Sequence, residues 1–262
     1  MTKGPIFLLK EPPLAWIVFN RPEMRNAVSL KMWQTLPSLV EEVAGDSSIR
    51  ILIIRGMGGK AFIAGADISQ FEKVRFGPSA GIYDDTMENA LSTLLDLEKP
   101  VIAMIQGGCI GGGCSVALRC DLRLAADDAW FGIPAARLGI AYNYGCIERL
   151  VQLVGPSHAS DILFSGRKDY DASEAYHMGL VTQIMPNAEL ENYVKTYALN
   201  MAGNAPLSLV AHKASIRETL HSSTRLNIER IKTPAARCIA SEDYKEGMAA
   251  FMEKRKPVFQ GK

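Results

Sequence analysis

Two glycine-bearing loops contain backbone groups that could do chemistry. They span residues 60–68 (KAFIAGADI) and 107–114 (GGCIGGGC). The second loop carries three consecutive glycines into a predicted helix start, where glycine permits positive φ and backbone N–H groups stay unpaired. Such a loop could hold an anion or a polarised carbonyl oxygen. A turn that only lets helix and sheet pack closely is the commoner role of a lone GGG, so the motif needs support from elsewhere.

Neither loop has the pattern of a nucleotide or metal site. The second loop lacks both a GxGxxG pattern with a well-placed ribose-binding acid and a GK[ST] ending. Cys109 and Cys114 lack the CxxC spacing and the nearby histidine of a zinc site. We therefore expect no metal site and no separate cofactor.

Each loop follows a predicted buried strand and precedes a predicted helix. The strands are residues 51–55 (ILIIR) and 101–105 (VIAMI), and the helices are 83–97 and 115–119. Short strands at 121–126 and 129–133 and a helix at about 144–154 extend the pattern. This recurrence of strand, loop and helix predicts an α/β core with largely parallel strands.

The two ends of the chain differ in character. Apolar runs at 6–9 and 15–19 flank Glu11-Pro12-Pro13, which predicts a hairpin, and Ser29 can cap a helix over 29–43. After a last strand-like segment at 180–185, only helical patterns remain, at 188–202, 206–220, 223–239 and 242–254. We therefore divide the chain into a core (1–204) and a helical C-terminal subdomain (205–262). The subdomain could serve oligomerisation or form a packed lid.

Composition excludes several classes of partner. The 262 residues carry a formal net charge of +1, so we expect neither nucleic acid nor an anionic membrane to be attracted. No apolar run approaches a membrane span, and the N-terminus lacks the apolar stretch of a secretory signal, which predicts a cytoplasmic protein. Five cysteines, an odd number, are expected to be free thiols.

Several motifs together resemble the enoyl-CoA hydratase/isomerase, or crotonase, family. They cover almost the whole chain in the family's order: Asn20-Arg21-Pro22 with Arg25-Asn26-Ala27, KAFIAGADI (60–68), the segment 99–125 around GGCIGGGC, FGIP…LGI (131–140) and AFMEKRKPVF (250–259). The resemblance implies a crotonase (ClpP-like) spiral of ββα repeats. It also implies a helical C-terminal trimerisation subdomain and a homotrimer or dimer of trimers.

The same resemblance implies a coenzyme A thioester as substrate. The backbone N–H groups of Ala66 and Gly112 would bind the thioester oxygen as an oxyanion hole, each contributing roughly 3 kcal/mol. The CoA moiety, which is part of the substrate, would lie near Arg25, Ala27, Ala64 and Ile68. Phe251 and Lys254, of the same chain or of a neighbouring subunit, would close over it.

Two positions depart from a typical hydratase of the family. Ser115 and Ala135 stand where such hydratases carry glutamates that manage the water and the α-proton. Alanine cannot transfer a proton, and serine needs an activating partner to act as a base. Ser115 could satisfy a backbone group or contact substrate. Glu148 could be proposed as a substitute base, although a solvated helix face explains it better.

The segment LGIAYN (138–143) resembles the methylmalonyl-CoA decarboxylase branch, as does the tail SEDYKEGMAAFMEKRKPVF (241–259). In that branch the hydroxyl at Tyr142 binds the leaving carboxylate, and water or Asn143 would govern later protonation. Tyr142 could instead be a loop aromatic packed on the core. The branch has histidine where Ala66 stands, so its carboxylate contacts are only partly reproduced.

These observations favour an acyl-CoA lyase that decarboxylates a malonyl-type thioester. Decarboxylation needs no base to form the enolate, and a glutamate 4 Å from the substrate carboxylate would cost about 4 kcal/mol at an effective dielectric of 20. An atypical enoyl-CoA hydratase or isomerase and a noncatalytic acyl-CoA-binding relative remain the alternatives.

Overall fold

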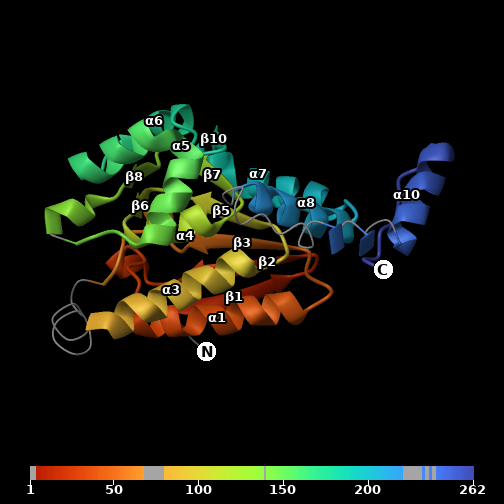
Figure 1. The fold of residues 1–262 in the computed structure, drawn as a ribbon, viewed down its shortest axis with the longest axis horizontal. Coiled ribbons are helices and arrows are strands. Elements are labelled where there is room, and N and C mark those ends of the chain that lie inside the picture. Colours follow the sequence, from red (N-terminus) through yellow and green to blue (C-terminus); the bar gives the residue numbers. More distant parts are fainter. Residues whose placement is uncertain (1–3, 68–79, 139, 221–231, 234–235, 238–239) are drawn as a thin grey trace.

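The strands form two sheets. The computed structural model describes residues 4–67, 80–138, 140–220, 232–233, 236–237 and 240–262 (Figure 1). A six-stranded sheet has the order β1-β2-β3-β5-β7-β10, with β1 Ile6–Glu11, β2 Leu14–Phe19, β3 Ile51–Gly56, β5 Val101–Ile105, β7 Leu122–Ala126 and β10 Gln183–Met185. A four-stranded sheet has the order β4-β6-β8-β9, with β4 Ala61–Ile63, β6 Gly108–Ile110, β8 Trp130–Gly132 and β9 Tyr170–Asp171.

The predicted opening hairpin is confirmed. β1 and β2 pair antiparallel, with Ile6 opposite Phe19 and Glu11 opposite Leu14. From β2 onward every pairing in the six-stranded sheet is parallel. The hairpin therefore forms one edge of a sheet that is otherwise built by crossover connections.

Each crossover repeats the same unit of two strands and a helix. β3 and β4 precede α3 (Ala80–Asp96), β5 and β6 precede α4 (Gly112–Arg119), and β7 and β8 precede α5 (Tyr144–Ser165). In every unit the first strand joins the six-stranded sheet and the second joins the four-stranded sheet. This arrangement confirms the predicted α/β class and the spiral of ββα repeats.

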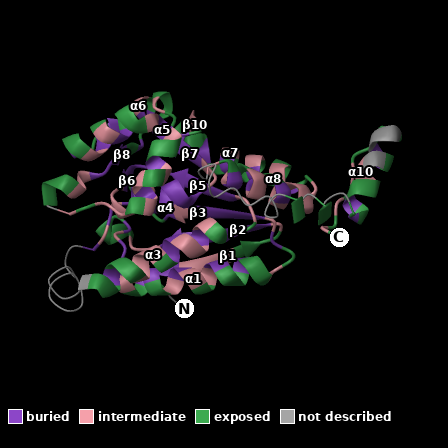
Figure 2. Ribbon diagram, viewed as in Figure 1, coloured by how far each residue is buried: buried purple, intermediate pink, exposed green. Residues whose placement is uncertain are grey.

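The inner strands β2, β3, β5 and β7 of the six-stranded sheet are buried on both faces, as expected for parallel strands with near-continuous apolar sequence (Figure 2). Along β2, Ala15, Ile17 and Phe19 pack into the core with α1 (Leu30–Gly45), α3, α4 and α5. Leu14, Trp16 and Val18 pack into a second core with α7 (Asn187–Ala202). The alternation along one strand thus supplies both faces of the sheet.

Helix boundaries show where the sequence patterns were incomplete. Ser29 caps α1 as predicted, its side chain accepting from the Met32 N–H. α4 begins at Gly112, not at residue 115, because the glycines themselves take helical geometry. α5 continues to Ser165 across a kink at Gly155, which has non-helical φ and ψ and is followed by Pro156. The strand predicted at 180–185 is confined to Gln183–Met185.

Short elements were missed by the sequence analysis. β4, β6 and β9 have two or three residues each, and α6 (Ala172–His177) has six. The 3-10 turns η1 (Pro22–Met24) and η4 (Pro134–Leu138) lie in segments for which no helix was predicted. Most of the helix predicted at 223–239 lies outside the described residues.

The C-terminal helices extend from one end of the core. α8 (Pro206–Thr219) is anchored by Lys213 Nζ, which lies 2.6 Å from the Asp121 carboxylate. α10 (Glu242–Met252) lies beyond α8, away from α3 and α4 (Figure 1). The Arg50 guanidinium donates to the Phe259 carbonyl oxygen at 2.6 Å and thereby fastens the tail. Among the described residues, no helix is long and apolar enough to cross a membrane.

Candidate active site

The glycine loop before α4 has a backbone that only glycine adopts readily. Gly111, the N-cap of α4, has φ 51° and ψ −107°. A Cβ on Gly113 would lie 2.1 Å from the Ile63 carbonyl oxygen, so the first turn of α4 rests directly on β4. The glycines therefore do serve the turn and the close helix–sheet packing that the sequence offered as the commoner role of a lone GGG.

The loop after β4 presents Ala66. Val28 and Ala66 form an isolated parallel bridge, in which the Val28 N–H donates to Gly65 O and the Asp67 N–H donates to Val28 O, both at 2.9 Å. Because neighbouring N–H groups on an extended strand alternate in direction, the Ala66 N–H points away from Val28. It makes no backbone hydrogen bond among the described residues.

The two predicted oxyanion-hole donors lie together. A Cβ added to Gly112 would be 3.6 Å from the Ala66 nitrogen and 3.5 Å from the Gly65 carbonyl carbon. Gly112 is the first residue of α4, a position whose N–H has no intrahelical acceptor. Ala66 and Gly112 are therefore neighbours in the fold, and among the described residues neither N–H has a backbone acceptor.

Trp33 of α1 forms part of the surroundings of Gly112. Its Cζ2 would lie 3.6 Å from a Cβ on Gly112, and its Nε1–H donates to the Tyr83 hydroxyl at 2.9 Å. The sequence analysis did not single out Trp33. Its place in the apolar periodicity of α1 marks it only as a core residue.

Polar residues of the Asn20–Ala27 region hold the Ala66 loop. Arg21 donates to the Ala27 carbonyl oxygen and to the Asp67 carboxylate, each at 2.9 Å. Fully buried Asn26 donates to Met57 O at 3.0 Å and Ala61 O at 2.8 Å. The Asn-Arg-Pro…Arg-Asn-Ala motif therefore has a structural function that the resemblance alone did not reveal.

Ser115, in place of a glutamate, is tied to Tyr142. Ser115 is 1% exposed, and its Oγ lies 2.7 Å from the Tyr142 hydroxyl. Tyr142 in turn donates to the Gly111 carbonyl oxygen at 3.0 Å. Burial raises the pKa of the Tyr142 phenol well above its ordinary value, so the hydroxyl stays protonated at neutral pH. Tyr142 also packs against the core, as the alternative interpretation predicted.

An ion pair links α4 to α3 one turn beyond Ser115. Arg119, one turn further along α4, is 6% exposed and contacts the Glu88 carboxylate of α3 at 3.3 Å. Burial raises the pKa of the nearby Cys146 thiol, and the charge of Arg119 opposes that rise. Glu88 is thus neutralised by a guanidinium.

The remaining residues expected around the acyl group have modest roles. Ala135 lies in η4 and is partly buried against the core. The Asn143 side chain caps α5 by accepting from the Cys146 N–H at 3.2 Å. Glu148 lies on α5 and is exposed, as the solvated-face interpretation predicted.

The residues expected to bind CoA fall into two groups. The Ala64 N–H donates to Arg25 O at 3.0 Å, which places Arg25 and Ala27 beside the Ala66 loop. Ile68 lies outside the described residues. Phe251 and Lys254 belong to the α10 region at the far end of the chain, so a single chain does not bring them to Ala66 and Gly112 (Figure 1).

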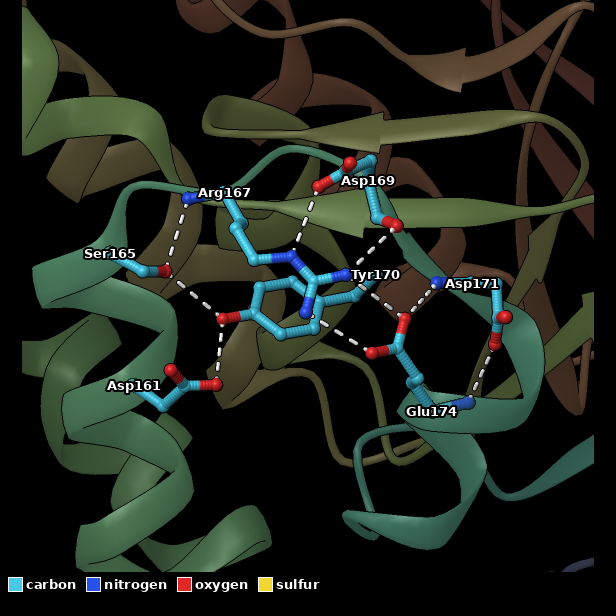
Figure 3. Close-up of polar contacts among 7 residues, drawn as sticks. All are labelled: Asp161, Ser165, Arg167, Asp169, Tyr170, Asp171 and Glu174. Carbon is cyan, nitrogen blue, oxygen red and sulfur yellow. Dashed lines mark hydrogen bonds and ion pairs between the residues drawn. The ribbon is translucent and has the colours of Figure 1, made fainter.

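The second side of the glycine loop rests on β8. The Gly111 N–H donates to Gly132 O at 2.9 Å, and a Cβ on Gly132 would lie 2.3 Å from the Cα of Lys168. The segment around Lys168 is held by a polar cluster in which Arg167 pairs with Asp169 and Glu174 and covers the Tyr170 ring (Figure 3). This cluster therefore supports the glycine loop indirectly, through the packing of the Lys168 segment on β8.

Other candidate side chains lie apart from the site. His158, His177 and His212 are exposed on α5, α6 and α8, whereas His221 lies outside the described residues. Cys109, Cys114, Cys120 and Cys146 are buried free thiols, as predicted, and Cys238 is not described. The Cys109 thiol donates a hydrogen bond to the Cys114 sulfur at 4.0 Å, and the two cysteines form no disulfide.

Comparison with known proteins identifies the group of enzymes to which the chain is similar. The family model described as enoyl-CoA hydratase/isomerase matches residues 10–262. The short-chain-enoyl-CoA hydratase of Clostridium acetobutylicum is 34% identical, covering 96% of this chain and 95% of that protein. The crotonyl-CoA hydratase of Syntrophomonas wolfei is 35% identical over 98% of each.

A solved structure gives the same result for the fold. The enoyl-CoA hydratase/carnithine racemase of Magnetospirillum magneticum superposes with a TM-score of 0.93 at 37% identity, covering 100% of this chain and 97% of that one. The two relatives at 34% and 35% identity are named as hydratases, so they support the family but not the decarboxylase branch within it.

Proposed function

This chain belongs to the enoyl-CoA hydratase/isomerase family, and we propose that it decarboxylates a malonyl-type CoA thioester. One observation carries the proposal: Ala66 and Gly112 are neighbours, whereas Ser115 and Ala135 stand at the two positions to which the resemblance assigns the glutamates of a hydratase. The site thus retains the means to stabilise an enolate without the usual means to make one by proton removal.

The proposed step balances without a base. The bond between the carboxylate carbon and the α-carbon breaks, and its electron pair enters the enolate as carbon dioxide leaves. Negative charge collects on the thioester oxygen, where the Ala66 and Gly112 N–H groups donate to it. A proton from water then reaches the α-carbon. In this scheme enolate stabilisation supplies most of the catalysis.

The surroundings suit a substrate that carries its own carboxylate. Ala135 brings no charge, and the Ser115 hydroxyl is bonded to Tyr142. Of the nearby acidic groups, Asp67 is paired with Arg21 and Glu88 with Arg119. A substrate carboxylate would therefore meet no unpaired anion in the described part of the site, which avoids a repulsion of several kcal/mol.

A second candidate is hydration or isomerisation of an enoyl-CoA. The names of the relatives favour it, since two that are about one third identical are hydratases. It would require an acid or base other than residues 115 and 135. The Glu88 carboxylate of α3 is already engaged by Arg119 at 3.3 Å, so it would have to leave that ion pair to serve in this role.

We also propose that a trimer or a dimer of trimers completes the CoA site. Phe251 and Lys254 lie far from Ala66 in one chain, so a neighbouring copy would have to supply them. This proposal keeps the resemblance's assignment of Arg25, Ala27, Ala64 and Ile68 to the CoA of the same chain.

Product analysis separates the candidates. The purified protein is incubated in D₂O with methylmalonyl-CoA, ethylmalonyl-CoA or crotonyl-CoA, and the thioesters are identified by mass spectrometry. Decarboxylation predicts propionyl-CoA or butyryl-CoA carrying one deuterium at the α-carbon. Rapid formation of 3-hydroxybutyryl-CoA from crotonyl-CoA would instead support the hydratase. No product from any of them would argue for a noncatalytic acyl-CoA-binding protein.

A further inference from the structure

The Gly111 carbonyl and the Gly112 N–H belong to one peptide group. We propose that Tyr142 is a positioning residue that acts on this peptide group and so aims and strengthens the Gly112 oxyanion-hole donor. The proposal rests on the function proposed above for the use of that donor. It differs from the role that the resemblance implies, in which the Tyr142 hydroxyl binds the substrate carboxylate.

Two hydroxyl groups lie within hydrogen-bond distance of Gly111 O. The Tyr142 hydroxyl is 3.0 Å from it, and the Ser115 hydroxyl is 3.4 Å from it and 2.7 Å from the Tyr142 oxygen. Each hydroxyl has one proton. Because Tyr142 is the nearer of the two to Gly111 O, we assign its proton to that carbonyl and the Ser115 proton to the Tyr142 oxygen. The resulting chain runs from the Ser115 hydroxyl through Tyr142 to the Gly111 carbonyl. Its far end is the Gly112 N–H.

Gly111 O accepts a second hydrogen bond from the Ser115 N–H at 3.0 Å. Two donors on one carbonyl draw electron density towards its oxygen, which makes the N–H of the same amide a better donor. Chains of hydrogen bonds strengthen one another by roughly 10–30% per bond. The Gly112 N–H thus becomes a stronger hydrogen-bond donor because of the two groups that bind the Gly111 carbonyl oxygen.

The same bonds fix the direction of the peptide plane. Gly111 has φ 51° and ψ −107°, a conformation outside the ordinary helical and extended wells. The Gly111 N–H is held by Gly132 O at 2.9 Å, and its carbonyl is held by Tyr142 and Ser115. Because this turn is fastened on both sides, the plane of the Gly111–Gly112 peptide cannot rotate freely.

The test is a carbonyl vibration that does not depend on turnover. Butyryl-CoA labelled with ¹³C at the thioester carbonyl is bound to the protein, and isotope-edited infrared difference spectra record its stretch. The oxyanion hole lowers this frequency in the wild type. In Tyr142→Phe we expect roughly a tenth to a third of the Gly112 share of that lowering to be lost, and kcat to fall about two- to fivefold with little change in KM.

Butyryl-CoA has no carboxylate, so the experiment separates the two roles of Tyr142. An unchanged frequency in Tyr142→Phe would overturn the proposal, even if decarboxylation slows, because that pattern indicates direct contact with a substrate carboxylate. An unshifted frequency in the wild type would overturn it too, since no polarising donors would then exist. A frequency change without any decarboxylase activity would sink the proposed function and leave the role of Tyr142 standing.

Two further variants serve as a control and as a second test. Tyr144→Phe changes a tyrosine two residues away that is 76% exposed, and it should leave the frequency unchanged. Ser115→Ala removes the hydroxyl that donates to Tyr142 but keeps the bond to Gly111. It should move the frequency in the same direction by less, and it provides the readout if Tyr142→Phe does not fold. A shift in Ser115→Ala as large as that in Tyr142→Phe would contradict the directed chain.

Discussion

Ser115 and Tyr142 are 27 residues apart, yet their hydroxyl oxygens meet at 2.7 Å. The resemblance supplied the positions of both residues and of the two N–H donors. Their contact could not be predicted, because it depends on how the segment 140–143 returns across the first turn of α4. The same contact gives the Ser115 hydroxyl a hydrogen-bond partner within the protein. A serine at this position therefore does not leave its own side chain unpaired.

Gly112→Pro tests the donor at the residue scale. Proline is tolerated at the first position of a helix but has no N–H, so α4 should form while one donor is lost. We expect kcat to fall by about 100- to 1,000-fold with the protein still folded. Steady-state kinetics and circular dichroism measure both effects. Activity within threefold of the wild type would remove Gly112 from the oxyanion hole.

The buried thiol of Cys120 should make the free energy of unfolding depend on pH. Burial raises the pKa of this thiol to about 12 from an ordinary value of 9.0. Above pH 9 the unfolded chain releases the proton whereas the folded chain keeps it, so rising pH favours unfolding. The free energy of unfolding should fall by up to about 1.4 kcal/mol per pH unit from this group. Urea unfolding from pH 8 to 10.5 should show a shallower fall in Cys120→Ala, and parallel profiles would refute the assignment.

At the scale of elements, long apolar runs were predictable and short strands were not. β2, β3 and β5 are continuous apolar segments, and their pattern suffices because both faces of a parallel sheet are buried. β4 and β6 have three residues each and lie inside the glycine loops, where no periodicity can develop. Yet these two strands bring Ala66 to Gly112. That Ala66 and Gly112 would be neighbours was predicted only from the resemblance to the family.

Asn26 holds the chain at the start of β4, and replacing it tests how much this side chain stabilises the fold. Its amide donates to Met57 O and Ala61 O and accepts from the Arg21 N–H at 3.0 Å. Asn26→Ala leaves those buried groups unpaired and should lower the free energy of unfolding by about 3 kcal/mol. Chemical denaturation measures it, with Asn89→Ala on the exposed face of α3 as the matched control. Equal stability of the two variants would show that Asn26 is not a structural anchor.

At the scale of the whole molecule, the ββα spiral places the site on one part of the chain and the C-terminal helices on another. Large apolar side chains stay exposed there, including Ile216, Tyr244 and Val258 at 60%, 49% and 70%. Helical periodicity predicted α8 and α10, but no property of one chain fixes what covers these surfaces. The division at residue 204 and the trimer remain predictions.

Sedimentation tests the assembly. We expect the wild type to sediment at three or six times the 28.6 kDa chain mass. A chain ending at residue 241 lacks α10 and should show weaker assembly, with a raised KM because the CoA site is incomplete. A monomeric wild type with normal affinity for acyl-CoA would contradict the proposal that a neighbouring copy supplies Phe251 and Lys254.

The most direct test of the central claim compares two reactions in one preparation. Release of ¹³CO₂ from carboxyl-labelled methylmalonyl-CoA gives kcat/KM for decarboxylation, and loss of crotonyl-CoA absorbance gives kcat/KM for hydration. Because each missing acid or base costs hydration about 100-fold or more, decarboxylation should be faster by at least about that factor. Hydration of crotonyl-CoA as fast as decarboxylation, or faster, would contradict the proposal.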